Sequence, residues 1–394
     1  MRTQLYINGQ WVPGASTVAV TDPSDGSVIA QVSIADDVQC EAAIAAADAV
    51  AVEWAATAPR FRSEILRKAF EIMTAEIEEI ATLISRENGK AIPDARGEAT
   101  YAAEFFRWFA EETVRTPGDF RMSPSGDKRI LVTHQPIGLS ILITPWNFPA
   151  GMATRKIGPA IAAGCTVIVK PATETPLTTL AIADILHRAG VPAGVVNVIT
   201  PTPAGPAITR LLQDPRLKNL SFTGSTQVGK ILLKQAADRV IRTSMELGGN
   251  APFIVLDDAD IDEAVKGAMI AKLRNGGAAC TAANRFYVSK KVAAQFTEKL
   301  TAAMAEIKMA SGLTEGAQLG ASVSVKERNK IADLVTASIA QGAELKLGGK
   351  TPDGDGAFYP PTVLTVAADN EILKEEIFGP VAVIVTVDSD EQAI

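Results

Sequence analysis

The chain has 394 residues, of which 47% are hydrophobic, and its formal net charge is −7. A chain of this length is expected to form two or three domains of about 100–200 residues. The acidic balance and the lack of a basic stripe exclude a general nucleic-acid binder. No apolar run reaches the about 18 residues needed to cross a bilayer, and the N-terminal residues show no signal pattern, so we expect a cytoplasmic protein that does not act at a membrane.

Cysteine and histidine are scarce. The chain has three cysteines, Cys40, Cys165 and Cys280, and two histidines, His134 and His187. Because the cysteines lie far apart in the sequence, neither a disulfide framework nor a Cys/His metal site is indicated, and we predict no metal. With only two histidines, the chain offers very few candidates for a Ser-His-Asp triad.

The N-terminal third is predicted to be mainly helical. Residues 5–12 alternate around Asn8-Gly9, which is typical of a small hairpin. Apolar residues recur at helical spacing over residues 36–56, 61–88 and 93–110. The four aromatic residues between 105 and 109 are expected on one helix face against a core. Residues 116–136 then change to glycine, proline and mixed charge, which predicts an exposed hairpin arm.

From Gly138 the chain alternates between strands and helices. Short strands of the buried type are predicted at residues 139–143, 167–169, 195–199 and 220–222, with helices at residues 152–163, 177–189, 204–212 and 227–237. Repeated strand-helix-strand units predict a parallel sheet with helices on both faces. Ligands of such sheets bind beyond the carboxyl ends of the strands.

A second alternating region follows residue 253. A strand is predicted at residues 253–255 and a last strand at 381–387, with helices at 261–272, 291–308 and 325–341. Ser389, followed by acidic residues, is a helix start signal. The sequence stops within one turn of that signal, so we expect a truncated chain.

Two glycine-rich stretches carry candidate catalytic groups. Residues 245–250 read MELGGN and residues 274–280 read RNGGAAC. Glycine leaves room for a ligand to approach the backbone, and the stretches deliver one carboxylate, Glu246, and one thiol, Cys280, from opposite ends of an intervening helix. Free cysteine is most often a small buried hydrophobe, and this alternative fits Cys165, in its apolar run, better. A general base and a nucleophile are therefore predicted.

These motifs resemble those of the aldehyde dehydrogenase superfamily, and the resemblance covers nearly the whole chain. It implies an α/β fold with a Rossmann-type parallel-sheet NAD(P)-binding domain over residues 1–116 and 138–247. It further implies a β-hairpin oligomerisation arm over residues 117–137 and a second α/β catalytic domain over residues 248–394, after which further polypeptide would follow. Homodimers or homotetramers are implied as well.

The resemblance assigns the chemical roles. Cys280 would attack the aldehyde, Asn147 in the segment Pro145–Pro149 would donate to the oxygen that becomes negative, and Glu246 would activate water. Family members usually have glutamine at the position of Ala278, so this chain departs from the pattern there.

The resemblance also assigns a cofactor site. Trp146, Lys170, Thr173, Gly224, Ser225, Leu247, Glu376 and Phe378 match its cofactor-binding positions. Many NAD-preferring relatives have glutamate at position 173, where it would repel a 2′-phosphate. Because Thr173 is neutral, we expect either NAD or NADP as cofactor, with NADP favoured, although Glu174 next to it would reverse this expectation if the register shifted by one residue.

Two arginines indicate the substrate. Arg155 and Arg274 match the positions where the succinate-semialdehyde group of the family holds a distal carboxylate, and the planar guanidinium can grip both carboxylate oxygens. Each arginine alone has an alternative as a surface ion pair. Together they favour a small aldehyde acid of four or five carbons.

Two other readings compete with a dehydrogenase. A catalytically silent, structural or cofactor-binding relative is compatible with Ala278 and with the abrupt end of the chain. Residues 224–230 also nearly satisfy the phosphate-loop pattern, but Ile231 stands where a magnesium-binding hydroxyl would be needed.

Overall fold

The computed structural model describes residues 1–394, which divide into two compact units. Unit 1 comprises Met1–Val20, Ala30–Leu83 and Arg96–Glu246, and unit 2 comprises Thr21–Ile29, Ile84–Ala95 and Leu247–Ile394. The predicted boundary between the cofactor and catalytic domains, after residue 247, lies one residue from the boundary between the two units, after Glu246. Two short segments, residues 21–29 and 84–95, belong to unit 2 although the prediction placed them with the cofactor domain.

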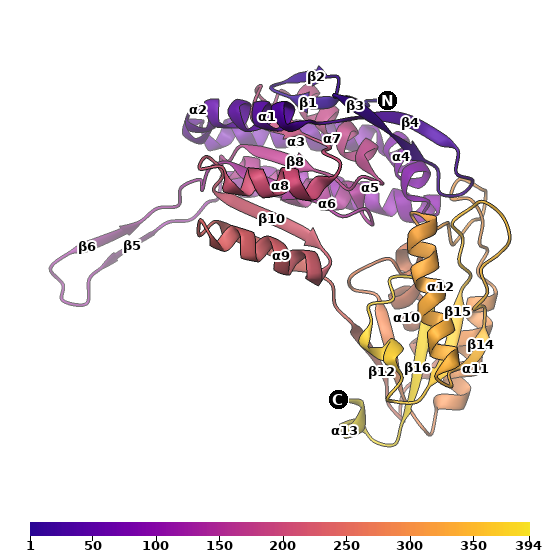
Figure 1. Ribbon diagram of the computed structural model, residues 1–394. Coiled ribbons are helices and arrows are strands. Elements are labelled where there is room, and N and C mark those ends of the chain that lie inside the picture. Colours follow the sequence, from indigo (N-terminus) through magenta and orange to yellow (C-terminus); the bar gives the residue numbers. More distant parts are fainter. The chain divides into compact units, whose positions relative to one another are not determined.

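Unit 1 is built on a seven-stranded sheet (Figure 1). Its strands, in the order in which they lie side by side, are β11 (Arg242–Leu247), β10 (Asn219–Gly224), β7 (Ser140–Ile143), β8 (Val167–Lys170), β9 (Val196–Val198), β1 (Leu5–Ile7) and β2 (Gln10–Val12). Strands β10, β7, β8 and β9 run parallel, whereas the N-terminal hairpin pairs antiparallel with the edge of β9. The predicted parallel sheet and the predicted hairpin are therefore present.

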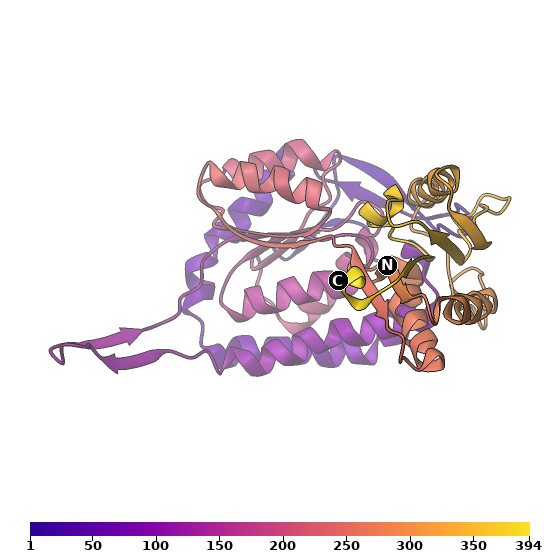
Figure 2. The same ribbon diagram turned by 90° about the horizontal axis from the view of Figure 1, so that it is seen from below.

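Helices cover both faces of this sheet (Figure 2). The helices of the first half are α1 (Asp37–Ala49), α2 (Ala51–Ala56), α3 (Pro59–Ala75), α4 (Ile77–Asn88) and α5 (Ile92–Thr113). The crossover helices are α6 (Pro149–Ala162), α7 (Pro176–Ala189), α8 (Ala204–Gln213) and α9 (Thr226–Ala237). Helices α6 and α7 pack with α3, and α1 packs with α8, which contacts α9.

The aromatic cluster of α5 does not share one face. Phe106 is fully buried, but the side chain of Trp108 is 60% exposed. Residues two apart on a helix point in nearly opposite directions, so the expectation that all four aromatics face the core was wrong for Trp108.

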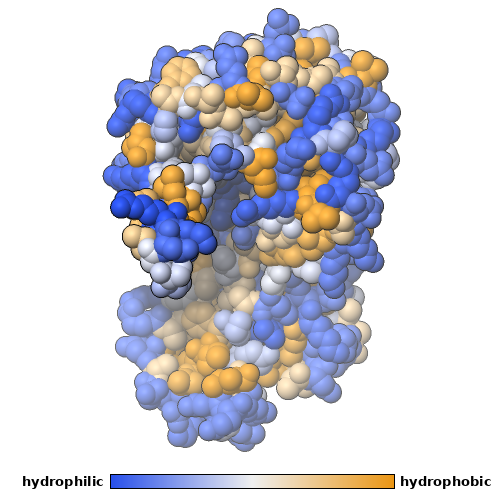
Figure 3. Space-filling view, turned by 90° about the vertical axis from the view of Figure 1, so that its left-hand side faces the viewer, coloured by the Kyte–Doolittle hydropathy of each residue, from blue (hydrophilic) through white to orange (hydrophobic).

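A two-stranded arm extends from unit 1. It consists of β5 (Asp119–Met122) and β6 (Arg129–Val132), paired antiparallel as the sequence predicted. Its apolar side chains are largely exposed, with Phe120 at 63% and Leu131 at 70%. On the face from which the arm extends, hydrophobic residues are interspersed among hydrophilic ones (Figure 3). A second two-stranded sheet, β3 (Ser16–Thr21) with β4 (Val28–Ile34), was not predicted.

Unit 2 is built on a five-stranded sheet in the order β12 (Ala251–Val255), β13 (Ala283–Ser289), β16 (Val381–Val387), β15 (Thr362–Val366) and β14 (Glu344–Leu347). All neighbours are parallel except β14, which is antiparallel to β15. Two cores result. One includes Phe286 and Phe296 with α10 (Ile261–Leu273) and α11 (Ala293–Ala305), and the other includes Ile331 and Val335 of α12 (Val325–Ala340).

Short helical turns complete unit 2. They are η1 (Arg274–Gly277), η2 (Glu371–Lys374) and α13 (Asp390–Ala393). The hydroxyl of Ser389 accepts a hydrogen bond from the Gln392 backbone N–H, so the predicted helix start is present. None of the helices is both long and apolar enough to span a bilayer.

Candidate active site

The segment after β7 carries the predicted oxyanion donor. Trp146 is half-buried and Asn147 is 5% exposed, and α6 begins two residues later at Pro149. Proline is favoured in the first turn because its fixed φ suits a helix and it lacks an N–H that would need a partner. The amide of Asn147 thus precedes a helix of fourteen residues whose start is sharply defined.

A carboxylate from another helix caps this start. Phe148 occupies the N-cap position of α6 and has no polar side chain to cap the first turn. Instead, Oε1 of Glu98 on α5 accepts hydrogen bonds from the backbone N–H groups of Ala150 at 2.8 Å and Gly151 at 3.2 Å. Glu98 is only 3% exposed. The Glu98 carboxyl group thus gives an acceptor to two N–H groups of the first turn, which have no partner within the helix.

The middle of α6 presents two cations. The Arg155 guanidinium lies 5.8 Å from the centre of the Phe105 ring. The buried Lys156 donates from Nζ to the hydroxyl of Ser221 at 2.7 Å. Burial and, to a smaller extent, the neighbouring Arg155 lower the pKa of Lys156 to about 8, although the charge of Glu246 acts in the opposite direction. Glu246, an exposed residue of β11, therefore lies within electrostatic reach of α6.

The end of β8 lines a small pocket. Its lining consists of Val18, Val32, Lys170, Pro171, Thr173, Pro176 and residues 200–202. Thr173 is part of this lining, and Glu174 is not. Burial lowers the pKa of Lys170, although the nearby Glu174 charge acts in the opposite direction. The pocket thus combines a half-buried cation with hydroxyl groups, and its lining contains no carboxylate.

Gly224 and Ser225 join β10 to α9. Gly224 is the last residue of β10, and a Cβ atom there would lie 2.5 Å from the ring of Phe222 in the same strand, so a side chain could be added only if that ring moved. The hydroxyl of Ser225 accepts from the Val228 backbone N–H at 3.4 Å and caps α9. A capped helix N-terminus next to a glycine is a suitable place for a phosphate group.

In unit 2, a left-handed turn precedes the candidate nucleophile. Asn275, Gly276 and Gly277 all have positive φ, at 55°, 59° and 78°. The turn is closed by Asn275, whose side-chain amide donates to the Ala278 carbonyl at 2.9 Å and whose own carbonyl accepts from the Ala278 N–H at 3.0 Å. These bonds use only the backbone of residue 278, so the loop closes without the glutamine that family members usually have there.

Asp94 supports the same turn. Its Oδ2 accepts from the Asn275 backbone N–H at 3.1 Å. Burial raises the pKa of Asp94, while the charges of Lys90 and Arg274 and the Asn275 bond lower it. Arg274 therefore lies in the field of a partly buried carboxylate within unit 2.

The three cysteines differ in access. Cys280 is exposed, whereas Cys40 and Cys165 are buried. Burial raises the pKa of Cys40 to about 11, which makes its thiolate scarce at neutral pH. Only Cys280 combines exposure with a glycine-rich turn, which supports the sequence-based distinction between it and Cys165.

The glycines of the MELGGN motif lie against Glu376. A Cβ atom at Gly248 would lie 2.1 Å from Oε2 of Glu376, and the Gly249 N–H donates to the Glu376 carboxylate. A Cβ atom at Gly249 would have the carbonyl oxygen of Cys280 as its nearest contact, at 3.9 Å. The structure therefore brings the two glycines of the motif, the backbone of the candidate nucleophile and Glu376 together within unit 2.

Glu376 lies in the field of two lysines and is incompletely hydrogen-bonded. Burial raises its pKa, and the charges of Lys330 and Lys272 lower it. Lys272 is itself fully buried, with its Nζ 3.0 Å from Oδ1 of Asn284 and its pKa lowered to about 7 by burial. Oε1 of Glu376 is buried and has no hydrogen-bond partner in the protein. Phe378, two residues later, has φ at +58°, a backbone conformation that is rare outside functional sites and turns.

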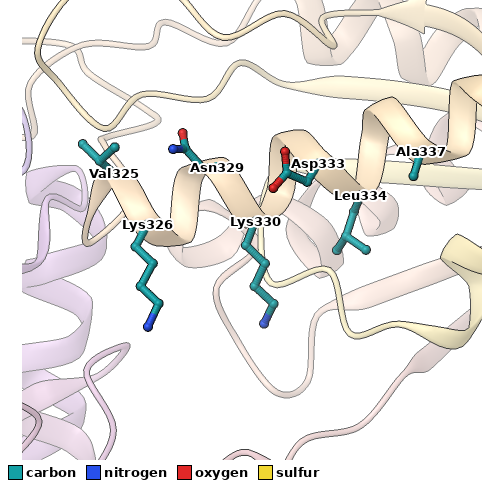
Figure 4. A pocket seen from close by; sticks show the side chains of 7 residues that line it. All are labelled: Val325, Lys326, Asn329, Lys330, Asp333, Leu334 and Ala337. Atoms are coloured by element: carbon teal, nitrogen blue, oxygen red, sulfur yellow. The ribbon is translucent and has the colours of Figure 1, made fainter.

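Lys330, whose charge lowers the pKa of Glu376, lies on α12 close to a second lysine. Lys326 and Lys330 are one turn apart and extend in the same direction from the helix (Figure 4). They line an open pocket together with Val325, Asn329, Asp333, Leu334 and Ala337.

Each unit by itself carries groups of the kind that bind part of a nicotinamide dinucleotide. The buried acceptor Oε1 of Glu376 has the chemistry to bind a ribose hydroxyl, and Gly248 leaves the space that Glu376 occupies. In unit 1, the Lys170 pocket and the capped start of α9 offer places for a second ribose and for phosphate. Lys330, Lys156, Asp94 and Glu98 are polar residues of these regions that the sequence did not single out.

Comparison with known proteins identifies the family. Residues 11–394 match the family model described as "Aldehyde dehydrogenase family". The chain belongs to the aldehyde dehydrogenase family, as its motifs predicted.

Individual relatives are more specific. The chain is 50% identical over 368 residues to a succinate-semialdehyde dehydrogenase of Paenarthrobacter nicotinovorans, covering 93% of this chain and 82% of the relative. It is 44% identical over 384 residues to an NADP(+) succinate-semialdehyde dehydrogenase of Escherichia coli K12, covering 97% of this chain and 80% of the relative.

The crystal structure of succinate-semialdehyde dehydrogenase from Burkholderia pseudomallei has the same fold. It superposes with a TM-score of 0.97 at 42% identity and covers 100% of this chain and 82% of the other. The predicted aldehyde dehydrogenase-like α/β fold is thus confirmed.

Proposed function

We propose that this protein oxidises a short semialdehyde acid, with succinate semialdehyde as the preferred substrate, to the dicarboxylic acid, using NADP or NAD. The observation that carries the proposal is the exposed Cys280 shortly after the left-handed turn at Asn275–Gly277, with Arg274 directly before that turn. The names of two relatives at 50% and 44% identity support the substrate class.

The first step is addition of the Cys280 thiolate to the aldehyde carbon. The carbonyl π-electrons move to oxygen, and the side-chain amide of Asn147 donates a hydrogen bond to the resulting oxyanion. Donors aimed at a developing charge are worth about a hundred- to a thousandfold in rate each.

A bound nicotinamide cofactor supplies the acceptor for the hydride that leaves the tetrahedral carbon. Glu376, Phe378 and Leu247 would hold its nicotinamide end, with Lys330 adding positive charge. Trp146, Lys170, Thr173, Gly224 and Ser225 would hold the adenosine and phosphate end.

The remaining thioester is hydrolysed by water. Glu246 takes a proton from that water as it attacks the thioester carbon, and the Cys280 thiolate leaves. An exposed carboxylate at the end of β11 is accessible to water, which suits this role.

Arg155 and Arg274 are proposed to bind the distal carboxylate of the substrate. The test compares Arg155→Leu and Arg274→Leu using succinate semialdehyde and butanal, which has the same number of carbons and no charge. We expect KM for succinate semialdehyde to rise at least about tenfold, since a charged hydrogen bond contributes roughly 1.5–3 kcal/mol, with little change for butanal. Equal losses on both substrates would remove the carboxylate-binding role.

NADP is proposed as the favoured cofactor because Thr173 lines the Lys170 pocket and Glu174 does not. Measuring kcat/KM with both cofactors tests this, and we expect the higher value with NADP. Thr173→Glu should reverse the preference by repelling the 2′-phosphate. A wild-type enzyme that strongly prefers NAD would contradict the proposal.

Thiol labelling distinguishes an enzyme from a silent relative. Iodoacetamide should modify Cys280 and abolish activity, and succinate semialdehyde with cofactor should protect it. An inert Cys280 in the native protein would favour a catalytically silent member of the family.

We also propose that the protein assembles as a homodimer or homotetramer through the β5–β6 arm. Its exposed Phe120 and Leu131 would be covered in such an assembly. Light scattering of the wild type and of a variant lacking residues 117–137 tests this. We expect fewer chains per particle in the variant, and the same number of chains in both would contradict the proposal.

A further inference from the structure

The buried side chain of Glu98 accepts hydrogen bonds from the first turn of α6, a helix from another part of unit 1. It lies on α5, is 3% exposed, and accepts from the N–H groups of Ala150 and Gly151. Both donors are in the first turn of α6 and are themselves buried. Ala150 and Gly151 come three and four positions after Asn147 in the chain.

Local sequence does not supply this cap. The helix starts with Phe148 at the N-cap and Pro149 in the first turn, and neither side chain can accept a hydrogen bond. A helix start without a local cap leaves its first N–H groups in need of another acceptor. Glu98 provides that acceptor from a residue 52 positions earlier than Ala150.

We propose that Glu98 is a positioning residue for the oxyanion donor: it anchors the first turn of α6 and thereby fixes the direction of the Asn147 amide. This inference rests on the proposed function, because it assigns Glu98 a role through Asn147. An oxyanion donor is effective only when it is already aimed at the developing charge, so a small displacement of the helix start is costly in the chemical step.

The inference predicts a specific kinetic pattern. Glu98→Ala leaves two buried N–H groups without this acceptor and allows the start of α6 to move. The rate of the single-turnover appearance of reduced cofactor should fall about ten- to a hundredfold, a part of the loss expected for removing an oxyanion donor. The dissociation constant for NADP should stay within about twofold, because the Lys170 pocket contains no residue of α6. Glu98→Gln, which keeps Oε1 as an acceptor, should retain most of the rate.

A double-mutant cycle with Asn147→Ala tests whether Glu98 acts through Asn147. In the Asn147→Ala background, Glu98→Ala should cost less than about threefold in rate, since the donor it positions is already gone. Glu104→Ala on the same helix, at a side chain that is 43% exposed, is the matched control and should change none of these quantities. If Glu98→Ala does not fold, Glu98→Asp, which retracts the carboxylate by one methylene, is used in the same cycle.

Three results would overturn the inference. Equal losses from Glu98→Ala in both backgrounds would show that Glu98 does not act through Asn147. A parallel loss of NADP affinity and of Tm would assign it a general structural role. An unchanged rate in Glu98→Ala would remove it altogether. Failure of the proposed function looks different: Asn147→Ala and Cys280→Ala alone would leave aldehyde oxidation unchanged, and the inference would fall with it.

Discussion

The two neighbouring glycines of the MELGGN motif give a sharp test of the proposed nicotinamide site. Gly248→Ala places a Cβ atom 2.1 Å from Oε2 and 3.0 Å from the carboxyl carbon of Glu376. Because no real Cβ contact is that short, the Glu376 carboxylate must move away from the position in which we propose that it binds the nicotinamide ribose hydroxyl. A hydrogen bond to a charged group is worth roughly 1.5–3 kcal/mol, and 1.4 kcal/mol is a factor of ten. KM for NADP should therefore rise roughly ten- to a hundredfold.

The control is the next residue. Gly249→Ala brings its Cβ atom to 3.9 Å from the Cys280 carbonyl oxygen, an ordinary contact, and neither glycine has a positive φ. It should leave KM for NADP within about twofold. Cofactor titration by fluorescence and steady-state kinetics measure both variants, alone and combined with Glu376→Ala. The reasoning is refuted if both alanine variants behave alike, or if Gly248→Ala costs as much without Glu376 as with it.

Two further predictions concern Glu246 and Lys156. Glu246→Gln should give a burst of reduced cofactor followed by turnover slowed about a hundredfold or more, because general-base assistance to thioester hydrolysis is lost; rapid-mixing absorbance measures it, and undiminished steady turnover would assign the base elsewhere. The pKa of Lys156 is lowered from 10.5 to about 8, so between these pH values the unfolded chain binds a proton that the folded protein has released, and stability rises with pH. Denaturant unfolding of Lys156→Met should show a rise from pH 8 to 10.5 that is smaller than that of the wild type by up to about 3 kcal/mol, and identical pH profiles would contradict the lowered pKa.

Features encoded in continuous stretches of sequence were predictable. The parallel sheet of unit 1 follows from buried strands alternating with helices, and the candidate nucleophile stands in a short glycine-rich motif. The contrast between Cys280 and Cys165 was also readable, because Cys165 lies within an apolar run and is buried. The roles of these residues in catalysis remain predictions.

Features that depend on distant partners were not predictable. In the sequence, Glu98 looks like any helical glutamate. The backbone N–H groups that donate to its carboxyl group are 52 and 53 residues away. Asp94 likewise meets Asn275 across 181 positions. Strands β14 and β15 are four and five residues long and lie among glycine- and proline-rich loops, so hydrophobic periodicity alone did not reveal them.

The left-handed turn at Asn275–Gly277 has a consequence for how the thiol is presented. Helix α10 ends at Leu273, and three successive residues with positive φ reverse the hand of the backbone before Ala278. Without that reversal the α-helix would continue into residues 274–280. Each added helical residue would rotate the direction of the sulfur by about 100° around the helix axis. The end of α10 at Leu273 thus determines on which side of the helix axis the Cys280 sulfur lies.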